Sequence, residues 1–430
     1  MSLNFQSTPS KQPPNILGIN AKTVHGHLGI ETNFVSAGQK ARRFRMLEIA
    51  QKLLYDPAKD WKSQERIVGC MRNMRTPFIQ IYRRADGSCA RYSGLATCSS
   101  IWGCPVCAER ISNVRRDEIT RARAKHQAAG GETYLMTLTF PHRRGEWSLA
   151  ELIALQTKAL QRWKNSRSYK RIMAQWGRVG NVKALEVTYG EHGWHPHTHE
   201  VLFANAGMQA ATADIGELKD TWIRCVIKVG LADASQINDM LLHSFDFKAG
   251  EFVAEYVAKY GREPEPSSRE LNTIKDRWGL QSEVTMFTRK EGHSKRGEYI
   301  GMTPFGLLAD YAENGATDSA ALYLDYVRAF KDKRQLTWTP GLKKHFGIDD
   351  IDDEDLPEMP QRVEEESLGL ISKEDWWLIL KHEKSGSRFN LLWIAASDGR
   401  PGIDWYLEQL RSQQPTNRGK FTILQPRPFY

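Results

Sequence analysis

Three histidines stand at alternate positions in the stretch GWHPHTHEVLF (193–203), namely His195, His197 and His199. Alternate side chains of a β-strand lie on one face, so a strand here would present three imidazoles together. Neutral imidazole is a common ligand of divalent metal ions. The spacing therefore indicates either a metal site or a polar edge strand that happens to carry histidines, and a further ligand is needed to favour the first.

A carboxylate joins this group if the preceding strand pairs with it. The stretch KALEVTYG (183–190) is rich in strand-forming residues, and a tight turn centred on Glu191 and His192 would make a hairpin. Residues then pair when their numbers sum to 383. This register places Glu186 opposite His197 on the same face.

Glu186, His197 and His199 are therefore the predicted metal ligands. Two imidazoles and one carboxylate suit Zn²⁺, iron or manganese by ligand type alone. For a phosphate substrate, Mg²⁺ or Mn²⁺ would act as the Lewis acid. His195 is a further candidate ligand, although we expect Pro196, which follows it directly, to turn it away.

Two tyrosines form a second candidate for chemistry. The stretch GEFVAEYVAKYG (250–261) has the pattern of a short helix, on which Tyr256 and Tyr260 share a face. A buried tyrosine pair is common in protein cores, but beside a metal ion and DNA a phenol can attack a phosphodiester. Because the pKa of phenol is about 10, the attack needs help, which Lys259 or the metal would supply.

Cysteines are concentrated in one region and predict a structural zinc site. Cys98, Cys104 and Cys107 have the spacing C-x5-C-x2-C, and the fourth ligand would be Cys70 or Cys89. The alternative is a set of reduced cysteines with no metal.

The charge distribution indicates a nucleic-acid partner. The net charge is +9, but residues 349–366 hold ten acids and one arginine, so the rest of the chain carries +18. Basic clusters with interleaved aromatic residues recur along that remainder, as expected of a surface for single-stranded DNA. On the helix predicted at 112–129, the candidate DNA contacts are Arg115, Arg116, Arg121 and Arg123.

The elements that would position these residues predict an α+β fold, with a central antiparallel sheet and helices packed on it. Ser148 and Glu151 have the spacing of a capping box at the start of one helix. In chain order we expect a strand at 132–141, a helix at 147–166, strands at 183–190 and 195–203, a helix at 214–229, a strand near 236–247 and a helix at 250–261. Another helix is predicted from Ala41 to Tyr55.

The chain divides into six predicted regions. They are a flexible tail (1–37), a basic region with the cysteines (38–130), a catalytic domain (131–265), a second basic region (266–348), an acidic linker (349–366) and a C-terminal module without a predicted role (367–430). No apolar run is long enough to cross a membrane and no secretory signal is apparent, so we expect a cytoplasmic protein. The absence of a G-x-x-x-x-G-K-[ST] motif predicts no nucleotide cofactor.

Three motifs in order resemble those of the HUH endonucleases, and among them the rolling-circle replication initiators of bacterial plasmids and phages. LMTLTF (135–140) resembles the first motif, HPHTHEVLF (195–203) the metal motif and EYVAKYGRE (255–263) the tyrosine motif. With the downstream stretches between 303 and 348, the resemblance covers roughly residues 60–350.

The resemblance implies an HUH catalytic domain related to RNA-recognition folds, which nicks single-stranded origin DNA. Tyr260 would form a 5′-phosphotyrosine link and release a 3′-OH that primes a host polymerase, with a host helicase opening the duplex. It leaves open whether Tyr256 is a second nucleophile or Glu255 activates water. It also favours Cys70 over Cys89 as the fourth zinc ligand.

Two other functions are compatible with the same residues. A transposase or relaxase of the same superfamily would apply this chemistry to a different mobile element. A zinc-containing DNA-binding regulator would use the histidines and tyrosines only as structural residues.

Overall fold

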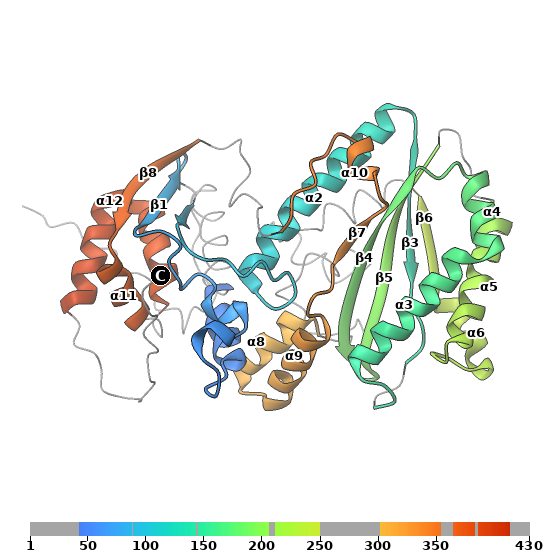
Figure 1. Ribbon diagram of the computed structural model, residues 1–430, viewed down its shortest axis with the longest axis horizontal. Helices are drawn as coiled ribbons and strands as arrows, with labels where there is room; N and C mark the ends of the chain where they lie inside the picture. Colours follow the sequence, from blue (N-terminus) through green and yellow to red (C-terminus); the bar gives the residue numbers. More distant parts are fainter. Residues whose placement is uncertain are drawn as a thin grey trace, which may run out of the picture.

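The structure is a computed structural model that describes residues 43–87, 89–142, 145–205, 211–249, 302–353, 364–382 and 386–412. The described strands form one five-stranded and one three-stranded sheet, which lie towards opposite ends of the molecule (Figure 1). Every strand pair in both sheets is antiparallel, and helices pack on each sheet. This confirms the predicted α+β class.

The five-stranded sheet carries the predicted histidine strand at its centre, in the order β6-β3-β5-β4-β7. Its strands are β3 (Glu132–Leu138), β4 (Gly180–Gly190), β5 (Gly193–Ala204), β6 (Phe245–Ala249) and β7 (Leu336–Trp338). Gly190 pairs with Gly193, which leaves Glu191 and His192 as the two-residue turn. The hairpin register predicted from the sequence is therefore confirmed.

One face of this sheet is covered by helices that follow β3 and β5. They are α3 (Leu149–Asn165), α4 (Arg167–Gln175), α5 (Thr212–Lys228) and α6 (Ile237–His243). Trp163 and Trp222 are fully buried in this layer, where large aromatic side chains contribute much of the apolar burial. The predicted capping box is present, since the Ser148 side chain accepts from Glu151 N–H and Glu151 reaches back to Ser148 N–H.

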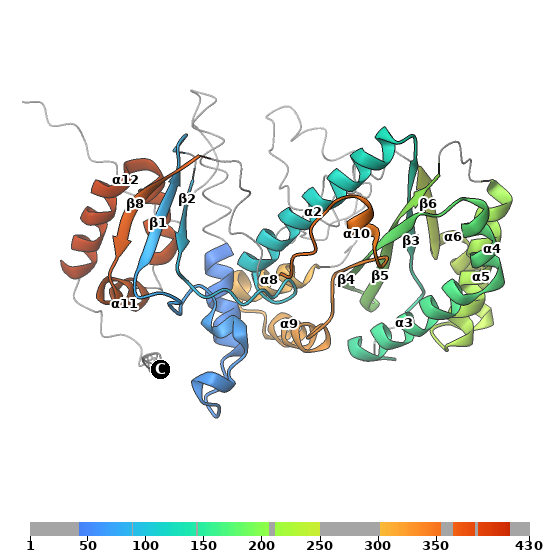
Figure 2. The same ribbon diagram turned by 45° about the horizontal axis from the view of Figure 1, so that its top comes forward.

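The other face is crossed by the long helix α2 (Pro105–Ala128), together with the short helix α10 (Leu342–His345), as Figure 2 shows. Ile119 of α2 and Phe346 after α10 share a core with Val201 and Phe203 of β5. Helices α8 (Pro304–Asn314) and α9 (Thr317–Ala329) join the core that contains the cysteines and α3. Segments far apart in sequence therefore enclose the sheet.

The three-stranded sheet draws its strands from both ends of the described chain. Its strands are β1 (Ile79–Arg84), β2 (Ala90–Ser93) and β8 (Glu365–Ile371), and it packs against α11 (Lys373–Lys381) and α12 (Ser387–Ser412). Strand β1 is central and pairs with both neighbours. The sheet thus joins two regions separated in the sequence-based division, 38–130 and 367–430.

Several element boundaries differ from the prediction. The strand expected near 236–247 is a helix, α6, followed by β6, because Asp233 and Gln236 form a capping box that starts a helical turn. Helix α2 begins at Pro105 rather than at residue 112, since Cys104 caps it and proline suits the first helical position. Helical residues run over 43–54, and the helix expected at 250–261 lies outside the described residues.

Membrane-spanning helices are absent from the described part of the chain: none of its helices is long and apolar enough to cross a bilayer.

Candidate metal centres

Glu186, His197 and His199 lie together on β4 and β5 and are called the hairpin group below. Glu186 pairs directly with His197, and its Oε2 atom lies 3.2 Å from His197 Nε2 and 3.3 Å from His199 Nε2. One ligand atom from each residue lies within 4.8 Å of the others, so the group can hold a metal ion. The side chains are 11%, 8% and 1% exposed, respectively.

The electrostatics of the hairpin group favour a charged carboxylate. Burial opposes ionisation of Glu186, but the charge of His199 and hydrogen bonds from His197 and His199 outweigh it and lower the pKa of this carboxyl below its usual value. Glu186 is therefore an ionised ligand that needs to lose no proton when a cation binds.

The two imidazoles are held by their other ring nitrogens. His199 Nδ1 lies 2.9 Å from Thr137 Oγ1 on β3, and His197 Nδ1 lies 3.2 Å from the His195 carbonyl oxygen. Donation from Nδ1 to these partners leaves the Nε2 atoms of both rings facing Glu186, where a protonated Nε2 donates to the carboxylate and a deprotonated Nε2 can bind a metal ion. Such partners orient imidazole ligands and fix their tautomer. Thr137 was not predicted as a site residue, although it lies in the motif LMTLTF.

His195 is a neighbour of the hairpin group rather than part of it. Pro196 does not turn it to the other face: its ring centroid lies 5.5 Å from that of His197 and 4.6 Å from that of His142, on which it stacks. Its Nε2 atom lies 3.2 Å from Thr139 Oγ1. Burial, followed by the charges of His197 and His142, lowers the pKa of His195 well below 6.5, so this imidazole is neutral. Sequence analysis also missed His142.

Four buried cysteines form a second candidate centre, called the cysteine group below: Cys70, Cys98, Cys104 and Cys107. Cys70 Sγ lies 3.6 Å from the Sγ atoms of both Cys104 and Cys107, and Cys98 Sγ lies 3.7 Å from Cys107 Sγ. A tetrahedron of Zn–S bonds of about 2.3 Å has edges of about 3.8 Å, so the sulfur positions fit zinc. Cys89 is not in the group, which leaves Cys70 as the fourth member, as the resemblance implied.

The cysteine group is built at the start of α2. Cys104 is the N-cap residue, and its Sγ accepts the N–H of Cys107 at 3.4 Å. Burial raises the pKa of the Cys98 and Cys104 thiols, whereas hydrogen bonds from Cys104, Cys70 and Cys98 hold the pKa of Cys107 well below its usual value. These hydrogen bonds therefore favour ionisation at Cys107, whereas burial opposes it at Cys98 and Cys104.

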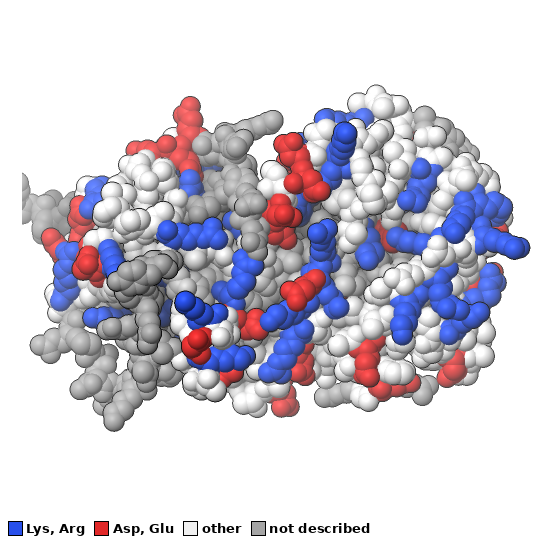
Figure 3. Space-filling model, viewed as in Figure 1, with Lys and Arg blue, Asp and Glu red and all other residues white. Residues whose placement is uncertain are grey.

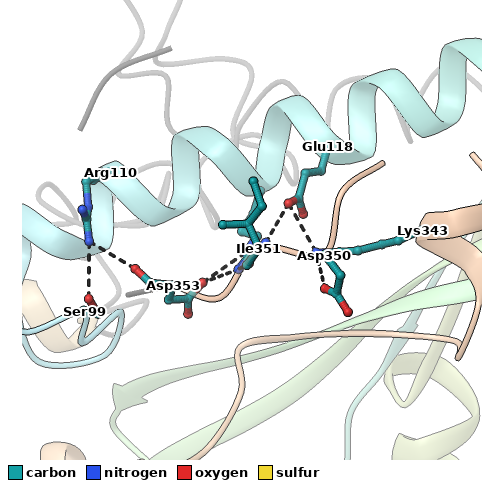
Figure 4. A network of polar contacts seen from close by, with 8 residues as sticks. Ser99, Arg110, Glu118, Lys343, Asp350, Ile351 and Asp353 are labelled. Atoms are coloured by element: carbon teal, nitrogen blue, oxygen red, sulfur yellow. Dashed lines mark hydrogen bonds and ion pairs between the residues drawn. The ribbon is translucent and has the colours of Figure 1, made fainter. Parts of the chain in front are cut away.

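The predicted DNA contacts on α2 occupy different environments. Arg115 is buried, and its guanidinium contacts Glu118 at 2.7 Å and Asp353 at 2.5 Å. Figure 4 shows the polar network that ties α2 to the segment after α10, so we assign Arg115 to the fold rather than to a DNA surface. Arg121 is exposed and pairs with Asp117, while Arg116 and Arg123 are partly buried.

A basic concave surface lies on the helical face, opposite to the hairpin group. It is lined by Lys158 and Arg162 of α3 and Lys228 of α5, with Gln161 and Asn165 between them. Lysine and arginine side chains gather in this part of the molecule in Figure 3.

The proposed nucleophile region, with Tyr256, Lys259 and Tyr260, lies outside the described residues. Its helix and its distance from the hairpin group therefore stay predictions.

The chain is similar in sequence to a known protein over most of its length. Protein rep of Streptomyces lividans is 28% identical over 364 residues, which cover 72% of this chain and 76% of that protein. The neomycin resistance protein of Streptomyces cyanogenus is 31% identical over 159 residues, which cover 31% of this chain and 36% of that protein. No family model and no solved structure matches the chain.

Proposed function

We propose that this chain is a replication-associated protein of the Rep type that nicks single-stranded DNA at an origin by metal-dependent tyrosine transesterification. The observation that carries the proposal is the hairpin group, a carboxylate and two oriented imidazoles at the centre of an antiparallel sheet. The similarity to Protein rep over 72% of the chain supports the replication role. The second relative is matched over only 36% of its length, so its name carries less weight.

The hairpin group would hold Mg²⁺ or Mn²⁺ and leave positions open for phosphate oxygens. A metal bound there supplies Lewis-acid polarisation of the scissile phosphate. Glu186 contributes the negative charge that holds the cation. Thr137 and the His195 carbonyl keep the two imidazoles aimed at the same point.

Tyr260 is the proposed nucleophile. Its phenol oxygen forms a bond to phosphorus while the bond from phosphorus to the 3′ oxygen breaks, which yields a 5′-phosphotyrosine link and a free 3′-OH. Lys259 would stabilise the phenolate as the phenol loses its proton. The phosphotyrosine conserves the bond energy, so a 3′-OH can later displace the tyrosine and rejoin the strand without a nucleotide cofactor. The second cleavage would be performed by Tyr256 or by water activated by Glu255.

The cysteine group and the exposed cations would support this reaction. The cysteine group, with Zn²⁺, would hold the start of α2 against α9, where Tyr323 donates to the Gly103 carbonyl. Exposed cations such as Arg121, Lys158 and Arg162 would contact the DNA backbone. A host polymerase would extend the 3′-OH and a host helicase would open the duplex, which implies action in the bacterial cytoplasm.

Nicking of labelled single-stranded origin DNA by the full chain tests the proposal. With Mn²⁺ present we expect a covalent protein–DNA adduct, which mass spectrometry would map to Tyr260. Tyr260→Phe should lose the first cleavage and Tyr256→Phe should retain it, and a chelator should abolish both. A Tyr260→Phe protein that still forms the adduct contradicts the nucleophile assignment.

The same assay separates the alternatives. An adduct that forms on the ends of a mobile element but not on a replication origin would indicate a transposase or relaxase. A wild-type protein that binds DNA tightly and forms no adduct with any divalent metal would indicate a zinc-containing regulator.

A further inference from the structure

A small cavity of about 30 Å³ adjoins the hairpin group at the outer edge of β4. The residues that line it include Glu186 and His197 of the hairpin, together with Thr303 and Gln335. The last two residues come from segments far downstream of the hairpin.

The cavity exists because the hydrogen-bond ladder along β4 is interrupted there. Leu185 N–H donates to the Gln335 carbonyl oxygen at 3.0 Å, and Tyr189 N–H donates to the Met302 carbonyl oxygen at 2.9 Å. Val187 lies between them, and its backbone faces the same edge because strand geometry alternates. Continuing the Tyr189–Met302 pairing would bring Pro304 opposite Val187, but proline has no N–H and here begins α8.

Gln335 carries a buried polar atom that no other described residue satisfies. The residue is 4% exposed, and its Oε1 atom has no hydrogen-bond partner within the described residues. A buried acceptor without a partner destabilises the folded state, because it has given up its hydrogen bonds to water and gained none. The cavity is large enough for a water molecule, which needs roughly 10–15 Å³ and two or more polar partners.

We propose that Gln335 is a positioning residue for the metal ion of the hairpin group: its side-chain carbonyl accepts a hydrogen bond from a water molecule in this cavity that is itself a ligand of that ion. The inference rests on the metal-binding part of the proposed function. A water bound to a divalent cation is a strong donor, so a neutral acceptor in a buried position suits it. Glutamine meets this need without adding a second negative charge beside Glu186.

Metal binding by the full-length protein tests the inference without relying on nicking. We expect Gln335→Leu to weaken Mn²⁺ binding about 10- to 100-fold in calorimetry, the usual effect of losing an outer-sphere partner. Gln335→Glu keeps an acceptor and adds charge, so Mn²⁺ should bind at least as tightly as to wild type. Thr337→Val is the matched control, since Thr337 is exposed on β7, two residues after Gln335, and this variant should bind Mn²⁺ normally.

Two further measurements separate positioning from a purely structural role. Water-proton relaxation by bound Mn²⁺ should fall in Gln335→Leu, because an ordered water ligand is lost or loosened. The metal-free unfolding temperature should stay unchanged or rise, since an unsatisfied acceptor has been removed. A large drop in that temperature with unchanged Mn²⁺ affinity would show that Gln335 serves the fold alone.

The outcomes also distinguish this inference from the proposed function. Equal Mn²⁺ affinity in wild type and Gln335→Leu overturns the inference and leaves the nicking proposal intact. Mn²⁺ binding that depends on Gln335 without any DNA adduct overturns the nicking proposal alone. A wild-type protein that binds no Mn²⁺ at Glu186 overturns both.

Discussion

The two candidate metal centres differ in how completely protein ligands would surround a bound ion. The cysteine group offers four ligands, each at most 4% exposed, and the sulfur separations match a tetrahedron. The hairpin group offers three ligands and adjoins a cavity. Structural zinc sites are closed by four protein ligands, whereas catalytic sites keep a position open. The cysteine group is thus closed in the way expected of a structural site, whereas the hairpin group has the open position expected of a catalytic one.

The two groups also differ in how the chain assembles them. The hairpin group comes from two adjacent strands whose register follows from a two-residue turn, so it forms locally. The cysteine group joins the residue after a short 3-10 helix (Arg66–Gly69), a loop and the start of α2. A metal bound there links separate segments, so its loss should cost stability, whereas loss of metal from the hairpin should cost activity.

The largest expected effect is removal of a zinc ligand. Cys104→Ser should lose about one zinc per chain and several kcal/mol of unfolding free energy, because binding to a structural site is worth roughly 10–16 kcal/mol. Metal analysis and thermal unfolding would measure this. Cys89→Ser is the control and should change neither. If Cys89→Ser loses as much zinc and stability as Cys104→Ser, the four members of the cysteine group are not the specific zinc ligands.

A ligand substitution in the hairpin group should lower nicking activity and leave stability unchanged. Glu186→Gln preserves size but removes the charge, so nicking should fall about 1,000-fold, which corresponds to several kcal/mol of Lewis-acid stabilisation. Zinc content and unfolding temperature should stay close to wild type. If Glu186→Gln unfolds the protein as Cys104→Ser does, both centres are structural.

The pH dependence of metal affinity should differ between the centres. Cys98 and Cys104 have raised thiol pKa values and hold their protons at neutral pH, so a metal must displace both protons. Zinc affinity should therefore rise with pH, roughly 100-fold per unit below the thiol pKa values. Glu186 has a lowered pKa and releases no proton, so in the range where an ordinary imidazole is neutral, above about pH 7, Mn²⁺ affinity should change less steeply. Chelator competition between about pH 7 and about pH 8 would compare the slopes, and equal slopes would contradict this.

The smallest effect is expected from a partner of one imidazole. Thr137→Val removes the hydroxyl 2.9 Å from His199 Nδ1 and should weaken Mn²⁺ binding about 10-fold. Zinc content should not change. Thr139→Val, which removes the neighbouring contact to His195, is the matched control and should leave Mn²⁺ affinity nearly unaltered. A larger loss in Thr139→Val would indicate that His195 is a ligand after all.

Local patterns were sufficient for the elements that position the hairpin group. The turn at Glu191 and His192 determined which residues pair, and hence that Glu186 faces His197. The capping box at Ser148 marked the start of α3 for the same reason: its contacts span three residues. The strand expected near 236–247 was wrong because a second capping box, at Asp233, competes with the strand pattern.

Contacts between distant segments could not be predicted from such local sequence patterns. The pairing of β8 with β1 joins residues more than 280 positions apart, such as Arg83 and Glu366. Arg115 belongs to a basic cluster that was assigned to one region, and Asp353 belongs to the acidic run that was assigned to another. In the structure these two residues form an ion pair. No pattern at either position indicates the other.

The sequence by itself determined the hairpin group, because strand alternation and a tight turn act over about twenty residues. The cysteine spacing also identified three of the four members of the cysteine group. Only the tertiary structure shows by geometry that Cys70, and not Cys89, is the fourth member of the cysteine group. It also pairs Arg115 with Asp353 and brings Gln335 to the same cavity as Glu186. The physical reason is that these choices depend on which distant segments pack together, and side-chain packing leaves no periodic signal along the chain.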